Sequence, residues 1–595
     1  MGIELVGRGA KKEKAEDLVQ RVAKRFEAAA SFRGKYEANW REYTRLYRSI
    51  IDEIARQTQN RRATLFVPQM FAQIETIVPR MVASIFASRP YVGAVPKGAE
   101  TTLDQALAME YLIDHQVGDR IKLRRQAGPW LREAAICGMA PAYVGWRREV
   151  RRLKVRRPVM EMQQIVGYQL VEEDVVTYDD PIFEPIDVFN FYWDPAAVGP
   201  DCVEKARYII HRSEVTKEYL EQMVEQMVFD KKGVKAALDA GKGAFVQSGT
   251  HTQRLADLGH GSPEDDTEDP IFELLACWEN DRVIAVLDRK HLVRAESNPF
   301  SHGRKPYVVA KFIPVLHEFS GIPIPEAAKS PQYELNEWRN IRMDNAVLRM
   351  HTPFMKLESI EIGLEDLILG PGEIIEVPTF DALKQLEIAD MSRSGYQEEE
   401  YLKGDIMTAT GANEVMRGLS PGNRATATEV ASRVEQGSFR MDDMRINVEE
   451  TAFIPAIEMI GAMNQQFMNH DKVIHIAGPE GAAMVAVAPE AIAGQFDFSF
   501  MGSSTEPIVN RDLHRQQWTQ LAGTLVNMPN VKVEEVVKRL LQVYDVRQPE
   551  RFVMSPEEQM QKAITAFLQA QAQQQPGQGQ PQPQAQPGGM PGVQA

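Results

Sequence analysis

The chain has 595 residues, 44% of them hydrophobic and 25% charged, and a formal net charge of −15 at pH 7. This length exceeds what one hydrophobic core supports and predicts several structural units. The acidic balance argues against a protein that wraps nucleic acid tightly, because tight wrapping needs a basic surface. Three widely separated cysteines, Cys137, Cys202 and Cys277, argue against a disulfide framework or a zinc site and predict small buried side chains in a reducing compartment.

The N-terminal residues carry no secretory signal pattern, and no apolar run approaches the ~20 residues of a membrane-spanning helix. We therefore expect a soluble protein without a membrane partner, kept inside a cell or a particle.

Helical periodicity dominates the first part of the chain. Apolar residues recur at helical spacing over 14–57, and further helical regions are expected over 66–90 and 100–140. Glycines and Pro141 end this pattern, and a strand is expected to begin near Tyr143.

A dense basic stretch runs from Trp146 to Arg157. Alternation places most of its side chains in water on a pair of strands, with a contact to DNA or to an acidic neighbouring subunit as the alternative. Later strands turn at Glu279–Asp281, a hairpin signature. Residues 231–269 lie between the basic stretch and these later strands. They are polar and glycine-rich and end in an acidic run, which predicts a mobile surface loop.

Two helices separated by a short segment are expected next. The first follows the stretch "GIPIPEAAKSP" and ends before Pro353. Residues 354–392 are strand-like, and a second helix spans 394–416. Its acidic run Glu398–Glu400 is expected to stabilise the helix start or to form an acidic surface that faces an anion. The residues expected on one face of the first helix are Glu334, Trp338, Ile341, Asn345 and Leu348.

A loop rich in glycine, serine, proline and asparagine follows, with Arg424 at its tip. It lacks the lysine and the Ser/Thr placement of a phosphate-binding loop. Thr426 and Glu429 then have the spacing of a capping box, which predicts the start of a very long helix with a kink at Pro455. The setting indicates a flexible tip between two rigid helices.

The remaining chain predicts strands at "KVIHIAG" and "FDFSF", two helices within 510–546 broken at Met528–Asn530, and a disordered Gln/Pro-rich tail. Together the elements predict an α+β fold that is predominantly α-helical.

Motifs of catalysis are not found. The sequence has no P-loop, no histidine set with metal-ligand spacing and no nucleophile elbow, so we expect no catalytic residue, no metal and no cofactor. The acidic pairs Asp442–Asp443 and Glu365–Asp366 leave a nuclease as the alternative, but adjacent acids on a helix face different ways. A scaffold protein that forms no ring is a further alternative.

The serial order of the segments closely resembles the portal protein, or head-to-tail connector, of tailed bacteriophages over roughly residues 30–545. The resemblance rests on "NPFSHGRKPYVV", "FSGIPIPEAAKSPQYELNEWRNIRMDN", "GPGEIIEV" and "TGANEVMRGLSPGNRATATEV", in this order. It implies a non-enzymatic ring, commonly a homododecamer, at one capsid vertex of the virion, through which double-stranded DNA passes in packaging and ejection. It implies assembly in the host cytoplasm, with these partners: further copies of the chain, weakly and non-specifically bound DNA, the terminase large subunit, a head-completion or tail adaptor protein, and the major capsid and scaffolding proteins.

The resemblance also divides the chain by position. It implies an N-terminal arm (1–29), a wing (30–325), a first stem helix (326–353), a clip (354–392), a second stem helix (393–416), a tunnel loop (417–425), a tunnel helix with returning wing (426–510), a crown (511–560) and a disordered tail (561–595). The implied DNA-facing residues of the tunnel loop are Leu419, Ser420, Pro421, Gly422, Asn423 and Arg424, with Thr426 and Glu429 as the helix cap and Gly370, Pro371, Gly372 and Glu373 as the clip contact region.

Overall fold

The computed structural model describes residues 14–50, 63–87, 89–98, 101–161, 164–241, 271–351, 354–356, 383–389, 392–411, 439–470, 472–478, 481–500 and 511–525, and single positions between 528 and 540. They fall into two units. The first comprises the chain up to Ile474 together with 486–509, and the second comprises 475–485 and the chain from Asn510 onward.

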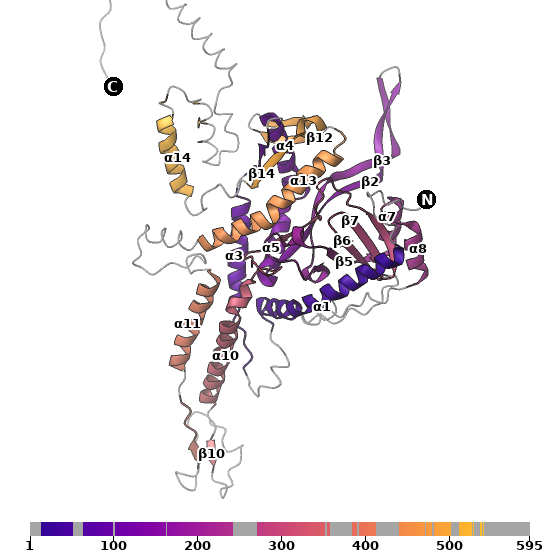
Figure 1. The fold of residues 1–595 in the computed structure, drawn as a ribbon. Coiled ribbons are helices and arrows are strands. Elements are labelled where there is room, and N and C mark those ends of the chain that lie inside the picture. Colours follow the sequence, from indigo (N-terminus) through magenta and orange to yellow (C-terminus); the bar gives the residue numbers. More distant parts are fainter. Residues whose placement is uncertain are drawn as a thin grey trace, which may run out of the picture. The chain divides into compact units, whose positions relative to one another are not determined.

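A five-stranded antiparallel sheet in the first unit is covered by helix α1 on one face (Figure 1). The helix spans Ala15–Arg48 and buries Leu18, Val22 and Phe26 against the sheet. It ends earlier than the predicted residue 57, because Ser49 takes a left-handed conformation and its N–H bonds back to the last turn. The strands, in sheet order, are β4 (Phe191–Trp193), β5 (Ile209–Thr216), β6 (Ile271–Trp278), β7 (Arg282–Leu287) and β8 (His291–Ser297).

Two short helices cover the opposite face of this sheet. They are α7 (Lys217–Glu225) and α8 (Lys231–Asp239), which bury Leu220 and Val234 against strand residues such as Phe272. The prediction of a mobile loop is wrong for residues 231–239, where the Asp230 carboxylate caps the helix by accepting from the Gly233 N–H. The predicted hairpin at Glu279–Asp281 is confirmed by the pairing of β6 with β7.

A long hairpin holds the predicted basic stretch. Strands β2 (Ala140–Glu161) and β3 (Gln164–Pro185) pair along their length, and the start of β2 also pairs with β9 (Tyr307–Ala310). The register sets Arg152 opposite Asp174 and Lys154 opposite Glu172. The acidic neighbour of the basic strand is therefore the next strand of the same chain.

Helices fill the space between the sheets, much as the periodicity predicts. They are α3 (Gln69–Ile85), α4 (Leu103–His115), the π-helical turn η1 (Gln116–Arg120) and α5 (Leu123–Cys137). The smaller elements are β1 (Val92–Pro96), η2 (Val188–Asn190), α6 (Cys202–Lys205), β12 (Lys472–Gly478), β13 (Gly481–Val487), η5 (Pro489–Ile492) and β14 (Phe496–Phe500). The two predicted late strands do not pair with each other: β12 pairs with β13, and β14 pairs with β1 from far upstream.

The second unit contains helix α14 (Arg511–Leu525), the first of the two helices predicted there, and helical positions recur at 533, 536, 537 and 540. In the whole described part of the chain the three cysteines are free and buried, as predicted. None of the described helices combines the length and apolar character that a bilayer crossing requires. The mixed helix and sheet content confirms an α+β fold.

Candidate functional site

Two helices lie side by side and are next in sequence to the predicted clip and the predicted tunnel loop (Figure 1). Helix α10 spans Ile324–Met350 and helix α11 spans Ser392–Thr410. α10 starts before the predicted position because Pro325 is tolerated in the first helical turn. Its buried positions include Ala328, Gln332, Leu335 and Arg342, whereas Glu334 and Leu348 of the predicted face are exposed.

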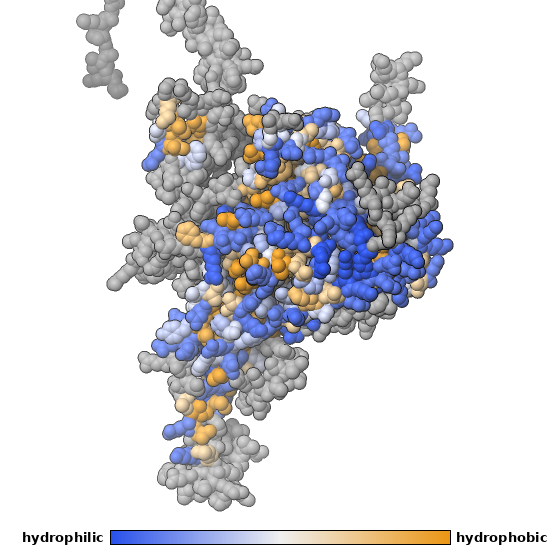
Figure 2. Space-filling view, in the orientation of Figure 1, coloured by the Kyte–Doolittle hydropathy of each residue, from blue (hydrophilic) through white to orange (hydrophobic). Residues whose placement is uncertain are grey.

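Apolar side chains remain at the surface of this helical pair. Met343, Leu348 and Met350 on α10 are exposed, as is Met355 just beyond it. Figure 2 shows apolar colouring along this part of the molecule down to β10. An exposed apolar row along a helix is typical of a surface that packs against a partner.

Glu399 is the ionic centre of the pair. Its buried carboxylate lies 2.9 Å from Arg339 Nη2 and 2.7 Å from Arg342 Nη1, both on α10, and 3.0 Å from Lys403 Nζ on its own helix. Burial raises the pKa of Glu399, but the hydrogen bond from Lys403 and the three positive charges outweigh it, so the pKa lies below its usual range. Of the predicted acidic run, this residue therefore joins the two helices rather than facing an anion.

A small sheet closes the end of the pair. Strands β10 (Phe354–Lys356) and β11 (Leu383–Gln385) are antiparallel. Lys356 pairs with Leu383, so the described chain breaks off and resumes at neighbouring positions. Asn345 of α10 also donates to the Ala389 carbonyl oxygen at 3.2 Å. The predicted clip residues Gly370, Pro371, Gly372 and Glu373 lie outside the described residues.

A ladder of polar side chains on α10 binds an extended segment of the chain. Asp344, Asn340 and Asn336 accept from the backbone N–H groups of Ala63, Leu65 and Val67 at 2.9, 2.7 and 2.9 Å. Gln332 continues the series by accepting from Met70 N–H at 3.1 Å and donating to the Val67 carbonyl at 2.8 Å. Four residues of helix rise about 6 Å and two residues of strand about 6.6 Å, so the two repeats match. This ladder was not predicted, although the four-residue spacing of its polar side chains is readable in the sequence.

The interval 412–438, which contains the predicted tunnel loop, is flanked by residues that lie close together. α11 stops at Thr410 rather than at the predicted residue 416, because Gly411 takes a left-handed φ of +78°. After the next described residue, Phe439, Arg440 donates to the Thr408 carbonyl oxygen at 3.2 Å. Residues Leu419, Ser420, Pro421, Gly422, Asn423, Arg424, Thr426 and Glu429 belong to the interval 412–438, outside the described residues.

The helix that follows is interrupted by one wide turn. Residues 439–448 are α-helical, Glu449–Phe453 form the π-helical turn η4, and α13 spans Ile454–Phe467. The interruption therefore lies just before Pro455, where the kink was predicted. Pro455 has no N–H for the preceding turn, and a π-turn accommodates that loss.

The π-turn places one aromatic and one acidic side chain in the interior. The Phe453 ring packs against Trp130, Phe86 and Phe500 with centroids 5.3–5.9 Å apart. Glu449 is buried, and its Oε1 atom has no hydrogen-bond partner among the described residues. Burial raises the pKa of Glu449 to about 7, although Arg445 opposes this.

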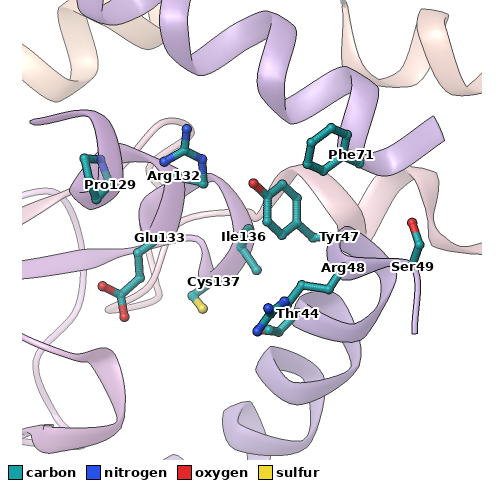
Figure 3. Close-up of a pocket in the computed structure, with 10 residues that line it drawn as sticks. All are labelled: Thr44, Tyr47, Arg48, Ser49, Phe71, Pro129, Arg132, Glu133, Ile136 and Cys137. Atoms are coloured by element: carbon teal, nitrogen blue, oxygen red, sulfur yellow. The ribbon is translucent and has the colours of Figure 1, made fainter. Parts of the chain in front are cut away.

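A pocket of about 630 Å³ lies where the end of α1 meets α3 and α5 (Figure 3). Arg132 on its wall is neutralised by Glu75, which it contacts at 2.6 and 3.1 Å, and Tyr47 also donates to Glu75. The hydrogen bond from Arg132 lowers the pKa of Glu75, and burial raises the pKa of Tyr47 to about 12. Neither group titrates near neutral pH, so this wall offers a paired ionic surface rather than a general acid or base.

The acidic pair weighed as a nuclease site has structural contacts instead. Asp443 accepts from the Asn447 amide at 3.2 Å, and Asp442 lies 3.9 Å from Arg445 on the same helix. Within the described ranges, no three His, Cys, Asp or Glu side chains are placed to hold a metal ion. Glu365 and Asp366 lie outside those ranges.

Comparison with known proteins gives one finding. The family model described as phage SU10 portal protein matches residues 152–588, which is more than half of the chain. The match covers α10 and α11, the intervals 357–382 and 412–438, and the second unit as far as residue 588. No curated protein matches the chain.

Proposed function

The chain belongs to the phage SU10 portal protein family, and from this premise we propose that it forms a ring at one capsid vertex, through which double-stranded DNA is packaged and ejected. The observation that carries the proposal is the family match over residues 152–588. Portal proteins are structural rather than enzymatic, and we propose the same for this chain.

In this proposal α10 and α11 are the two stem helices. The segment between β10 and β11 is the clip, whose residues Gly370, Pro371, Gly372 and Glu373 contact the terminase large subunit and later a head-completion or tail adaptor protein. The pairing of β10 with β11 supports this assignment, since it holds both ends of the segment at the tip of the helical pair. The exposed apolar residues of α10 support contacts between subunits, because a ring of identical chains needs two complementary faces on each copy.

The interval 412–438 holds the proposed tunnel loop, 417–425, with Thr426 and Glu429 capping the helix behind it. Gly411 and Arg440 support a projecting segment, because they hold the two ends of the interval 412–438 together. An acidic ring repels phosphate and keeps DNA free to slide. Asn423 and Arg424 at the tip would touch the DNA backbone without reading its sequence.

The remaining assignments follow the order of the chain. Residues 1–29 are the arm, 30–325 the wing, 426–510 the tunnel helix with returning wing, 511–560 the crown and 561–595 the tail. The ring is proposed to be a homododecamer that assembles in the host cytoplasm with scaffolding and major capsid proteins and remains in the virion.

Light scattering with negative-stain imaging of the purified full-length chain tests the proposal. A closed ring with a central hole is expected, and its mass divided by the mass of one chain gives the number of subunits. A monomer with metal-dependent nuclease activity would overturn the proposal in favour of the enzyme alternative, and open or filamentous assemblies would favour a scaffold.

A further inference from the structure

Lys311 is a fully buried lysine that directly follows strand β9. Its Nζ atom donates to the Gly199 carbonyl oxygen at 3.0 Å and to Cys202 Sγ at 3.0 Å. It also lies 5.3 Å from the centroid of the Phe319 ring. The contacts described for this nitrogen are thus a carbonyl, a thiol and an aromatic face.

Cys202, the first residue of α6, brings its sulfur unusually close to this nitrogen. The side chain is 1% exposed. A separation of 3.0 Å is that of an ordinary N–H···O hydrogen bond, although sulfur is the larger acceptor. The pair is therefore held near the distance from which a bond between nitrogen and sulfur can form, with no rearrangement of the backbone.

We propose that Cys202 and Lys311 are a covalent modification site, at which oxidation by a peroxide joins Sγ to Nζ. Nothing in the portal function requires such a bond, and it is independent of the DNA channel.

The chemistry balances in two steps. Hydrogen peroxide oxidises the Cys202 thiol to a sulfenic acid and is itself reduced to water. The Nζ lone pair then attacks Sγ, the S–O bond breaks, and the departing hydroxide takes a proton from nitrogen to leave as water. One thiol, one amine and one peroxide thus give an S–N bond and two waters. A second peroxide can transfer one oxygen to Sγ as its O–O bond breaks, which leaves the S–N bond as a sulfinamide and releases one more water.

The environment makes this reaction slow. Burial raises the pKa of the Cys202 thiol, although Lys311 opposes that effect, so little thiolate is present at neutral pH. Only a small oxidant can reach the sulfur. We expect cross-linking over prolonged exposure and none in a reducing cytoplasm.

The bond would fasten the loop that leads into α10. Gly199 N–H already donates to the Glu318 carbonyl at 3.0 Å, and Gly321 N–H donates to the Gly138 carbonyl at 3.1 Å. A covalent link from α6 to Lys311 adds a covalent tie at the base of this loop. The cross-linked protein should therefore unfold at a higher temperature than the reduced protein.

Peptide mapping of the full-length protein by mass spectrometry tests the proposal. Protein aged with hydrogen peroxide should yield a joined pair of peptides containing Cys202 and Lys311, with the mass of their sum less two hydrogens, or with one oxygen added to that mass. Treatment with dithiothreitol should return the two separate peptides from the joined pair that carries no added oxygen. Recovery of Cys202 only as a thiol, or only as sulfinic or sulfonic acid, with Lys311 unmodified would overturn the proposal.

Matched variants test whether Cys202 and Lys311 are the two residues joined by the bond. Cys202→Ser should remove the joined peptides, and so should Lys311→Arg, which keeps a buried cation without a nucleophilic amine. Cys277→Ser should retain them, because Cys277 is equally buried but neighbours Arg25 rather than a lysine. Joined peptides that persist in Lys311→Arg would also overturn the assignment. If that variant does not fold, the map of the unsubstituted protein still decides.

Discussion

Gly411 lies directly against Arg440: a β-carbon built on the glycine would come within 2.8 Å of Arg440 Cδ. The two residues stand on either side of the interval 412–438, and Arg440 also bonds to Thr408 in the last turn of α11. The interval that holds the proposed loop thus begins and ends at a junction whose geometry depends on a residue without a side chain.

Replacement of this glycine should weaken the junction. Gly411→Ala places a side chain at φ +78°, a left-handed conformation that costs about 1–2 kcal/mol for other residues. The contact with Arg440 adds little, since that side chain can move. Thermal unfolding should show the loss, and hydrogen exchange should locate it at the end of α11. Gly404→Ala in the same helix is the control: no atom lies within 4 Å of its added β-carbon, so it should stabilise the helix by about 1 kcal/mol. Equal effects of the two changes would contradict this account.

Glu399→Gln should separate α10 from α11. The substitution leaves Arg339, Arg342 and Lys403 without their shared carboxylate, and the expected cost is about 2 kcal/mol, since two of these cations are partly exposed. Because the folded pKa of Glu399 is lowered, its stabilisation is present above the ordinary pKa of the residue and is lost as the pH falls through the folded value. The difference between variant and parent in thermal unfolding should therefore vanish in acid. Glu398→Gln, on an exposed neighbour, should change little at any pH.

The effect of Glu449→Gln on stability should be opposite in sign to that of Glu399→Gln. The folded pKa is raised from 4.5 to about 7, so the folded state holds a proton that the unfolded state releases. The parent protein should therefore lose stability as the pH rises from about 4.5 to about 7, by about 3 kcal/mol at most. The glutamine variant should lack this loss and be the more stable protein at pH 8. Urea unfolding across this pH range measures it, with exposed Glu450→Gln as the control. A parent stability that stays constant over this range, or that falls equally in the glutamine variant, would show that Glu449 is not the group responsible.

The sequence predicts the presence of helices and strands better than it predicts where helices end or which strands pair. The helices around Phe26, Trp130 and Ile406 follow from apolar periodicity, but α1 and α11 stop where Ser49 and Gly411 turn left-handed, a local event that periodicity does not report. The pairing of β1 with β14 joins residues such as Val92 and Phe500, and no local pattern contains that information.

In the candidate site, too, local contacts are visible in the sequence and contacts between distant segments are not. Glu399 and Lys403 have a visible four-residue spacing, whereas Arg339 and Arg342 reach the carboxylate only because α10 packs beside α11. The prediction for the acidic run was therefore wrong for Glu399, since a second helix supplies two of its cations, and it stays a prediction for the exposed Glu398 and Glu400. For Leu419 to Arg424 the structure adds only the junction from which they start, and their DNA-facing role stays a prediction.

The ladder on α10 should come apart one rung at a time. Asn340→Ala removes the acceptor for Leu65 N–H, and a lost hydrogen bond of about 1 kcal/mol corresponds to roughly five-fold faster amide exchange there. Asn336→Ala should act in the same way at Val67. Glu334→Ala is exposed on the same helix and should leave both amides unchanged. Exchange that rises equally at all the bonded amides in each variant would instead show that the segment releases as one piece.

Deletion of Ser420–Asn423 tests the proposed tunnel loop. The anchoring contacts at Gly411 and Arg440 lie outside the deletion, and so do the helical pair and the exposed apolar row. Rings should therefore form as in the parent and show a central hole by negative stain. Packaging or retention of DNA should fall, because the tip that would touch the phosphate backbone is gone.

A deletion of the same size in the Gln/Pro-rich tail, Gln573–Pro576, controls for the loss of four residues and should leave both assembly and retention unchanged. Arg424→Ala separates charge from length: it should weaken retention more at low than at high salt, because the lost contact is ionic. If rings fail to form after deletion of Ser420–Asn423, the segment holds subunits together rather than DNA. If rings form and retention is unchanged, the channel is narrowed elsewhere.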